Sequence, residues 1–220
     1  NFETNKTYRA NLIKNIIRKK TNRNLNSVFL FSSVVPKVLG NFKRSLRFTK
    51  FKILEIKSLE LNRIIKINIK NKKNLGSDRI ANAIGAKKFK NCLVLDFGTA
   101  TTFDVIKNGV YEGGVIAPGV KLSIKNLSQS TALLPLINLS SNQKNYGKTT
   151  IEALNAGFVW GYEGLINNII NKITINWKMN YKIILTGGYA NLFKKFIKRR
   201  AIVDQNITIN GVSKVYRKFL

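Results

Sequence analysis

Residues 91–119 read NCLVLDFGTATTFDVIKNGVYEGGVIAPG, and this stretch carries the signals that decide the fold. It opens with Cys92–Leu95, an apolar run with the length and residue types of a buried strand. Two further β-prone runs, residues 102–106 and 110–117, flank the dipeptide Asn108-Gly109. Asn-Gly between apolar runs is typical of a tight hairpin, because both residues tolerate positive φ. The stretch therefore predicts successive strands joined by short turns.

The turn after the first strand has a specific chemistry. Asp96 ends the strand, and a carboxylate at such a position can hold a cation. Gly98 lets backbone N–H groups approach an anion, because it has no Cβ. The hydroxyl of Thr99 can donate to a phosphate oxygen. The alternative is a plain hairpin in which the aspartate and threonine only cap the turn.

Several motifs together resemble one protein family. The segments LGSDRIANAIGA, LDFGTATTFDVI and YEGGVIAPG occur in that order and are similar to the motifs of type III pantothenate kinases, which belong to the actin-like, sugar-kinase and Hsp70 superfamily. The resemblance implies an α/β fold with two actin-like (ribonuclease-H-like) lobes and mixed sheets. It implies an N-terminal lobe in residues 1–90, incomplete at its start, and a C-terminal lobe in residues 91–220.

The resemblance also implies a substrate site. Gly76, Ser77, Asp78 and Arg79 match the family motif that binds pantothenate, in which the aspartate serves as the base. The residues alone permit the same chemistry, since a helix N-terminus attracts anions and an arginine can grip a carboxylate. The alternative is that Ser77 or Asp78 only caps the helix. Thr150, before a long helix over residues 151–173, matches a threonine that contacts pantothenate, and the alternative is again a cap by Thr149 or Thr150.

For the second substrate, the resemblance implies ATP. Gly98 and Thr99 would contact an ATP phosphate, Asp96 would hold a monovalent cation, potassium or ammonium, and Mg²⁺ would arrive with ATP. Two family features are missing. The usual strand followed by Asp-x-Gly-Asn-Thr is absent, which predicts either a fragment that lacks its first hairpins or a pseudokinase. Ile69 stands where the family tends to have a tyrosine that contacts pantothenate.

Composition excludes several classes of site. The 220 residues include one cysteine and no histidine, so an internal disulfide, a histidine-based triad and a histidine-ligated metal site are all excluded. The net charge of +29 suggests a polyanion partner, but lysine is spread along the chain with abundant asparagine and isoleucine, as AT-rich codons produce. We therefore expect no nucleic-acid partner. No apolar run is long enough for a membrane helix, and we expect a cytoplasmic protein.

The remaining segments alternate between strand and helix patterns. Predicted strands are residues 28–35, 51–56, 64–69 and 183–186, and predicted helices are 7–20, 37–47, 80–86, 119–129 and 190–200. Gly157, Gly161 and Gly164 share one face of the long helix, where each costs about 1 kcal/mol relative to alanine. Core packing is one reason for them, and a homodimer interface, which the resemblance implies, is the other.

Two functions of different classes follow. The first is ATP-dependent phosphorylation of pantothenate to 4'-phosphopantothenate, the opening step of coenzyme A synthesis. The second is a non-catalytic regulatory or nucleic-acid-binding protein on the same scaffold, which the charge and the missing phosphate turn favour. The intact motifs around Asp78 and Asp96 oppose this second function.

Overall fold

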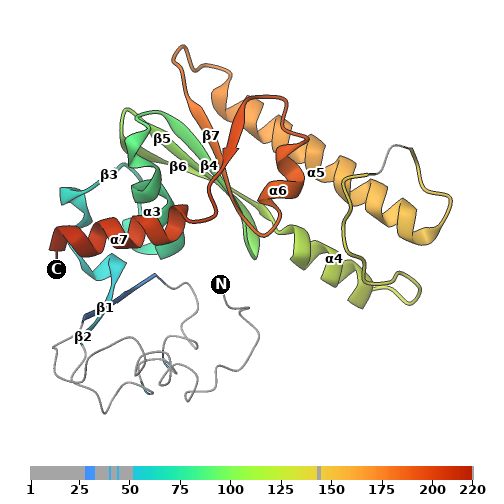
Figure 1. Ribbon diagram of the computed structural model, residues 1–220, viewed down its shortest axis with the longest axis horizontal. Helices are drawn as coiled ribbons and strands as arrows, with labels where there is room; N and C mark the ends of the chain where they lie inside the picture. Colours follow the sequence, from blue (N-terminus) through green and yellow to red (C-terminus); the bar gives the residue numbers. More distant parts are fainter. Residues whose placement is uncertain (1–27, 33–39, 41–43, 45–51, 143–144, 220) are drawn as a thin grey trace.

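The computed structural model describes residues 28–32, 40, 44, 52–142 and 145–219. The predicted helix over residues 7–20 lies outside the described residues, as does most of the one over residues 37–47. The described part forms a central sheet with helices on both faces and a small two-stranded sheet beside it (Figure 1). This arrangement confirms the predicted α/β class with a mixed sheet.

The central sheet has six strands in the order β3-β6-β5-β4-β7-β8. Their bounds are β3 Lys66–Ile67, β4 Cys92–Phe97, β5 Ala100–Lys107, β6 Val110–Pro118, β7 Lys182–Gly187 and β8 Ala201–Val203. The pairs β4–β5 and β5–β6 are antiparallel, whereas β4–β7, β7–β8 and β3–β6 are parallel. The hairpin between β5 and β6 turns at Asn108 and Gly109, with φ values of 52° and 76°, which confirms the expected tight turn.

Helices cover both faces of this sheet. Helices α3 (Ser77–Gly85) and α7 (Ile207–Phe219) pack on one face, against alternate strand residues such as Val94, Ile106 and Ile184. Helices α4 (Val120–Gln129), α5 (Thr150–Thr174) and α6 (Ala190–Lys194) pack on the other face, with Leu93, Leu95 and Phe103. Because residues 92–95 of β4 are buried on both faces, this part of the strand is a continuous apolar run.

The segment before β3 forms smaller elements. Strands β1 (Val28–Phe31) and β2 (Lys52–Glu55) pair in parallel, and β1 contacts α7. Two short 3₁₀ turns, η1 Ile56–Ser58 and η2 Leu61–Arg63, lead to β3. Two more lie on either side of α3: η3 Lys72–Asn74 before it and η4 Ala86–Lys88 after it. Cys92 lies buried in β4, and burial raises the pKa of its thiol to about 12, so that the thiol is an unreactive part of the core.

Some predicted boundaries were wrong. The basic helix expected over residues 190–200 ends at Lys194, because the chain then turns to pair β8 with β7. The strand expected over residues 64–69 is reduced to the two residues of β3, at the edge of the sheet. The predicted division at residue 90 stays a prediction, although α3 shares its core with α7 and the sheet.

Helices α3 and α7 approach each other unusually closely, and glycines make this possible. A Cβ added at Gly211 of α7 would lie 1.9 Å from the carbonyl oxygen of Ala81 on α3. A Cβ added at Gly85 of α3 would lie 2.2 Å from the carbonyl oxygen of Ile207. Each glycine therefore faces the backbone of the opposite helix, and no side chain fits between them.

Gly211→Ala should therefore destabilise the protein, because the backbone of α3 must move to make room for the methyl group. We expect a loss of about 1–3 kcal/mol, typical of overpacking, and a melting temperature lower by ~2–4 °C per kcal/mol for a chain of this size. Gly188→Ala is the matched control, because nothing lies within 4 Å of an added Cβ there. Equal melting temperatures for the two variants would contradict the close contact.

Candidate active site

The first turn of α3 presents the residues of the Gly-Ser-Asp-Arg motif. Gly76 is the N-cap, with φ −60° and ψ 139°, and no side chain caps this helix end. The predicted cap by Ser77 or Asp78 was therefore wrong, because the extended residue is Gly76 and the next two already lie within the helix. Ser77 instead donates its hydroxyl to Glu55 of β2 at 3.2 Å. Asp78 accepts the backbone N–H of Arg79 at 2.8 Å and stays half-buried.

Arg79 points toward the sheet. Its Nε donates to Oδ1 of Asp104 on β5 at 2.6 Å, and the hydroxyl of Tyr111 on β6 donates to the same oxygen at 2.9 Å. The guanidinium also lies over the Tyr111 ring, 6.0 Å from its centroid. Gly114 leaves the space that this side chain fills, since an added Cβ would lie 2.5 Å from Nη2 of Arg79. Arg79 thus joins three of the sequence motifs.

This ion pair is buried and only partly satisfied. The side chain of Arg79 is 13% exposed and that of Asp104 is fully buried. Burial raises the pKa of Asp104 to about 7, although Arg79 and the Tyr111 hydroxyl oppose that rise. Burial opposes the charge of Arg79 too, but Asp104 outweighs it, and the pKa of the guanidinium lies above its usual value. Nη2 of Arg79 and Oδ2 of Asp104 are buried without a hydrogen-bond partner.

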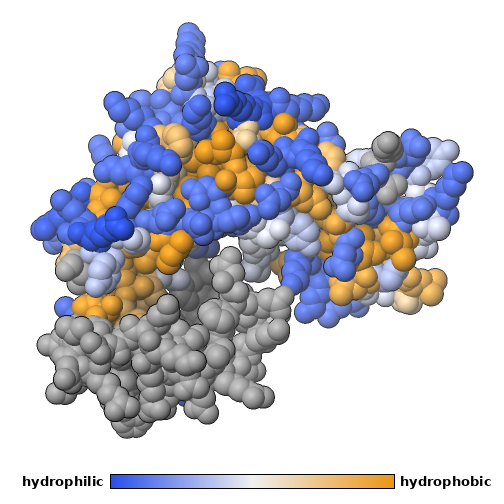
Figure 2. Space-filling model, viewed as in Figure 1, coloured by the Kyte–Doolittle hydropathy of each residue, from blue (hydrophilic) through white to orange (hydrophobic). Residues whose placement is uncertain are grey.

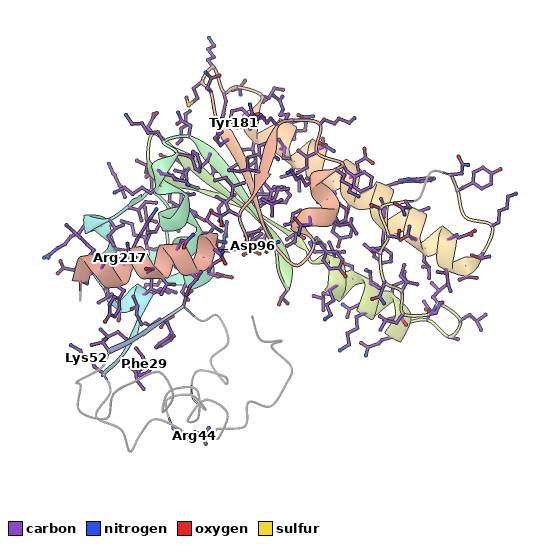
Figure 3. The ribbon with its side chains drawn as sticks, in the orientation of Figure 1. Phe29, Arg44, Lys52, Asp96, Tyr181 and Arg217 are labelled. Carbon is purple, nitrogen blue, oxygen red and sulfur yellow. The ribbon has the colours of Figure 1, made fainter. Side chains whose placement is uncertain are left out.

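Asp96 lies at the end of β4, near the centre of the molecule, where α7 begins (Figure 3). Its Oδ2 accepts a hydrogen bond from Nδ2 of Asn82 on α3 at 3.0 Å. Burial raises the pKa of Asp96, the Asn82 hydrogen bond lowers it, and the charge of Asp78 raises it. The first turns of α3 therefore reach both strands, because Arg79 bonds Asp104 and Asn82 bonds Asp96.

Oδ1 of Asp96 faces two glycines. A Cβ added at Gly187 would lie 2.7 Å from this oxygen, and one added at Gly98 would lie 3.6 Å from it. Gly187 also has a positive φ of 85° and passes close to the backbone of Phe97, so that the position strongly favours glycine. Among the described residues no donor bonds Oδ1 of Asp96, so this oxygen is available as a ligand for a cation.

The glycine-threonine turn projects from the sheet. Gly98 and Thr99 are exposed, and Gly119 supports them, because a Cβ there would lie 1.9 Å from the carbonyl oxygen of Thr99. The N–H of Gly98, however, already donates to the carbonyl of Ala100 at 3.1 Å. A phosphate at this turn would have to replace that bond or use the groups of Thr99.

Thr150 lies apart from the other predicted site residues. It is the first residue of α5, whose N-terminal end is at the far side of the molecule from α3 (Figure 1). Thr149 caps this helix: its hydroxyl accepts the N–H of Glu152 at 3.3 Å, and Glu152 accepts the N–H of Thr149 at 3.1 Å. The cap predicted for Thr149 or Thr150 is thus made by Thr149. Thr150 itself is exposed.

The structure therefore brings Gly76–Arg79 and Asp96–Thr99 together and adds residues that sequence reasoning missed. Asp104, Tyr111 and Asn82 hold the predicted residues in place. The alternation of β5 could have found Asp104, because Thr102 pairs with Asp96 and the residue two positions further shares its face. Nothing in the sequence pattern singled out Asn82.

The described residues contain neither a cluster of potential metal ligands nor a helix that could span a membrane. Among residues 28–32, 40, 44, 52–142 and 145–219, no group of three or more histidine, cysteine, aspartate or glutamate side chains could hold a metal ion. Within the same part of the chain, no helix combines the length and apolar character needed to cross a membrane.

Comparison with known proteins decides the family. A family model described as type III pantothenate kinase matches residues 1–172. The type III pantothenate kinase of Pelagibacter ubique is 49% identical over 193 residues, which cover 87% of this chain and 77% of the relative. That of Sulfurihydrogenibium sp. is 34% identical over 196 residues, covering 86% of this chain and 76% of the relative. The chain belongs to the type III pantothenate kinase family.

Solved structures show the fold of this family member independently. A conserved Baf-family protein from Campylobacter jejuni superposes with a TM-score of 0.62 at 22% identity, covering 94% of this chain and 87% of the other. The Alp12 filament structure gives a TM-score of 0.53 at 18% identity, covering 96% and 75% of the two chains. These neighbours confirm the predicted actin-like fold.

The buried ion pair gives a prediction about stability. Asp104→Leu should lower the free energy of unfolding by about 3–5 kcal/mol, because it leaves the charge of Arg79 buried and unpaired. The triple variant Arg79→Met, Asp104→Leu, Tyr111→Phe should recover most of that loss, because no polar group is then left without a partner. Urea unfolding of both variants measures the difference. If the triple variant is as unstable as the single one, the ion pair stabilises the fold more than apolar side chains in its place would.

Proposed function

We propose that this chain transfers the γ-phosphate of ATP to pantothenate and so forms 4'-phosphopantothenate, the first step of coenzyme A biosynthesis. Membership of the type III pantothenate kinase family supports the reaction. One observation supports it most: Asn82, one helical turn after Asp78 on α3, donates to Asp96 at the end of β4 at 3.0 Å. A candidate base for an alcohol would then lie close to a candidate binding turn for phosphate.

Asp78 would orient or deprotonate the hydroxyl group of pantothenate. It is half-buried, and its Oδ1 is held by the N–H of Arg79, so Oδ2 is the oxygen that would meet the hydroxyl. The chain has no histidine that could replace it. Gly76 and Ser77 would contribute the N-terminal end of the helix, where partial positive charge favours a negatively charged substrate.

Arg79 would contribute a positive charge to substrate binding. Its Nε is already used by Asp104, so a two-pronged grip through Nε and Nη2 is blocked in this conformation. Nη2 has no hydrogen-bond partner, and a substrate oxygen could satisfy it. We infer that Arg79 offers one donor to pantothenate and that its other contacts fix the place from which it does so.

ATP would bind at the exposed turn of Gly98 and Thr99, and Mg²⁺ would arrive with its phosphates. Asp96 would hold a monovalent cation, potassium or ammonium, because its Oδ1 has no hydrogen-bond donor among the described residues and lies beside the turn at Gly98. Such a cation would neutralise phosphate charge during transfer. For phosphoryl transfer, positioning and charge stabilisation supply most of the catalysis.

Thr150 could serve the site only from another copy of the chain, given its distance from α3 (Figure 1). We propose a homodimer in which α5 forms the contact. Gly157, Gly161 and Gly164 are exposed, with nothing within 4 Å of an added Cβ, so they are not explained by packing within this chain. Large apolar side chains are exposed nearby, including Trp160 at 43% and Ile151 at 60%. Figure 2 shows apolar surface on the side of the molecule that carries α4 and the start of α5.

Asp78→Asn should lower the rate of pantothenate phosphorylation by about 10²–10⁴-fold, the usual contribution of a general base. Pantothenate binding, measured by calorimetry, and the melting temperature should change little, because asparagine keeps the size of the side chain and can still accept the N–H of Arg79. Turnover at the normal rate in this variant would leave Asp78 with no catalytic role.

Mixing two inactive variants tests the shared site. Asp78→Asn and Thr150→Ala should each be poor kinases as homodimers. After joint unfolding and refolding, mixed dimers should regain activity, because one of their two sites combines an intact Asp78 with an intact Thr150 from the other copy. Mixtures of Asp78→Asn with Arg79→Ala serve as control and should stay inactive, since each site takes its α3 from one chain and so always contains one of the two changes. A mixture of the first pair that stays inactive would oppose a shared site.

A further inference from the structure

A pair of polar side chains lies behind Asp96. Asn82 on α3 is 0% exposed, and its Nδ2 donates to Oδ2 of Asp96 at 3.0 Å. Its Oδ1 accepts the hydroxyl of Thr208, in the first turn of α7, at 2.6 Å. The carboxylate is thus connected through two hydrogen bonds to a residue 112 positions further along the chain, since 208 − 96 = 112.

The direction of these hydrogen bonds is set by chemistry. An ionised carboxylate only accepts hydrogen bonds, so Asn82 must turn its amide nitrogen toward Asp96. The amide oxygen then faces Thr208, whose hydroxyl has to donate. Because Asn82 is fully buried, an unpaired amide group there would be costly. Each group in the series therefore fixes the orientation of the next.

The backbone of α7 holds Thr208 in place for this contact. The glycine contacts of Gly211 with Ala81 and of Gly85 with Ile207 bring the two helices together on either side of it. Just before α7, the side chain of Gln205 donates to the carbonyl of Gly187 at 3.1 Å. The start of α7 thus contacts both Asn82 and Gly187, which lie on two sides of the Asp96 carboxylate.

We propose that Asn82 and Thr208 are positioning residues for Asp96. They hold Oδ2, and so keep Oδ1 turned toward the turn at Gly98, free to serve as a ligand of the proposed potassium or ammonium ion. The closing helix of the chain is then part of the cation site although it supplies no ligand. This inference rests on the proposed role of Asp96.

If Asn82 and Thr208 had only a structural role, the expected effect of potassium on stability would differ. If the hydrogen bonds only join α7 to α3, their loss lowers stability by the same amount with and without the cation. If they position Asp96, their loss also weakens cation binding. The response of stability to potassium separates the two, and it needs neither pantothenate nor ATP.

The test compares three variants of α7 with the unchanged chain. Thr208→Val keeps the shape of the side chain but removes the donor, whereas Thr208→Ser keeps the donor. Ser213→Ala removes a hydroxyl from the same helix away from Asn82. The melting temperature is measured while potassium chloride replaces choline chloride at constant ionic strength. Its rise is fitted to a stabilisation of RT ln(1 + [K⁺]/Kd), and the fitted Kd, the potassium concentration at which half of the sites are filled, is called the midpoint below. Asp96→Ala supplies the baseline without a cation ligand.

We expect the melting temperature of the unchanged chain to rise with potassium and that of Asp96→Ala to stay constant. Thr208→Val should need about 2- to 10-fold more potassium to reach its midpoint, the range that one hydrogen bond supports. Thr208→Ser and Ser213→Ala should keep the original midpoint. The potassium concentration for half-maximal kinase activity should shift by the same factor, with the rate at saturating potassium largely restored. If Thr208→Val does not fold, Thr208→Ala replaces it.

Two outcomes would overturn the inference. In the first, Thr208→Val melts at a lower temperature but keeps the midpoint of the unchanged chain. In the second, the unchanged chain shows no response to potassium. A chain that responds as expected but fails to phosphorylate pantothenate would contradict the proposed function, while the melting curves would still support the positioning role.

Discussion

The buried pair of Arg79 and Asp104 is the contact on which the rest of the site depends. It joins the first turn of α3 to the middle of the sheet, with Tyr111 as a second donor to the same carboxylate oxygen. Removing two charges from water costs several kcal/mol per ion, so such a pair contributes little net stability. Its contribution is positional: the bond from Arg79 to Asp104 fixes the first turn of α3, and with it the neighbouring Asp78, relative to the sheet.

The two faces of the central sheet carry different kinds of side chain near its strand ends. Asp96, Thr102 and Asp104 share the face that α3 and α7 cover, where polar side chains from both helices reach the strand ends. The opposite face, under α4, α5 and α6, is an apolar core with stacked rings such as Phe97 and Phe193. One face thus carries the residues proposed for catalysis, and the other packs against the long helix proposed for dimerisation. Asp96 lies at the end of β4, the strand whose side chains are buried on both faces of the sheet.

The glycines of this chain have different structural roles. Gly114 makes room for the guanidinium of Arg79, and Gly119 lets the chain pass the carbonyl of Thr99. Gly211 allows two helices to touch, which brings Thr208 to Asn82. Gly157, Gly161 and Gly164 face open space instead, so the same residue type marks internal contacts at some positions and a free surface at others.

The sequence by itself determined the strands and the turn chemistry of residues 91–119, because alternation, buried apolar runs and the Asn108-Gly109 turn are local signals. It also indicated the family through Asp78, Arg79 and Asp96. It could not show that Arg79 faces Asp104, that α7 supports Asp96 through Asn82, or that Thr150 lies far from both. Those facts depend on how segments distant in sequence pack together, and only the tertiary structure decides which backbone passes close enough for a side chain to reach.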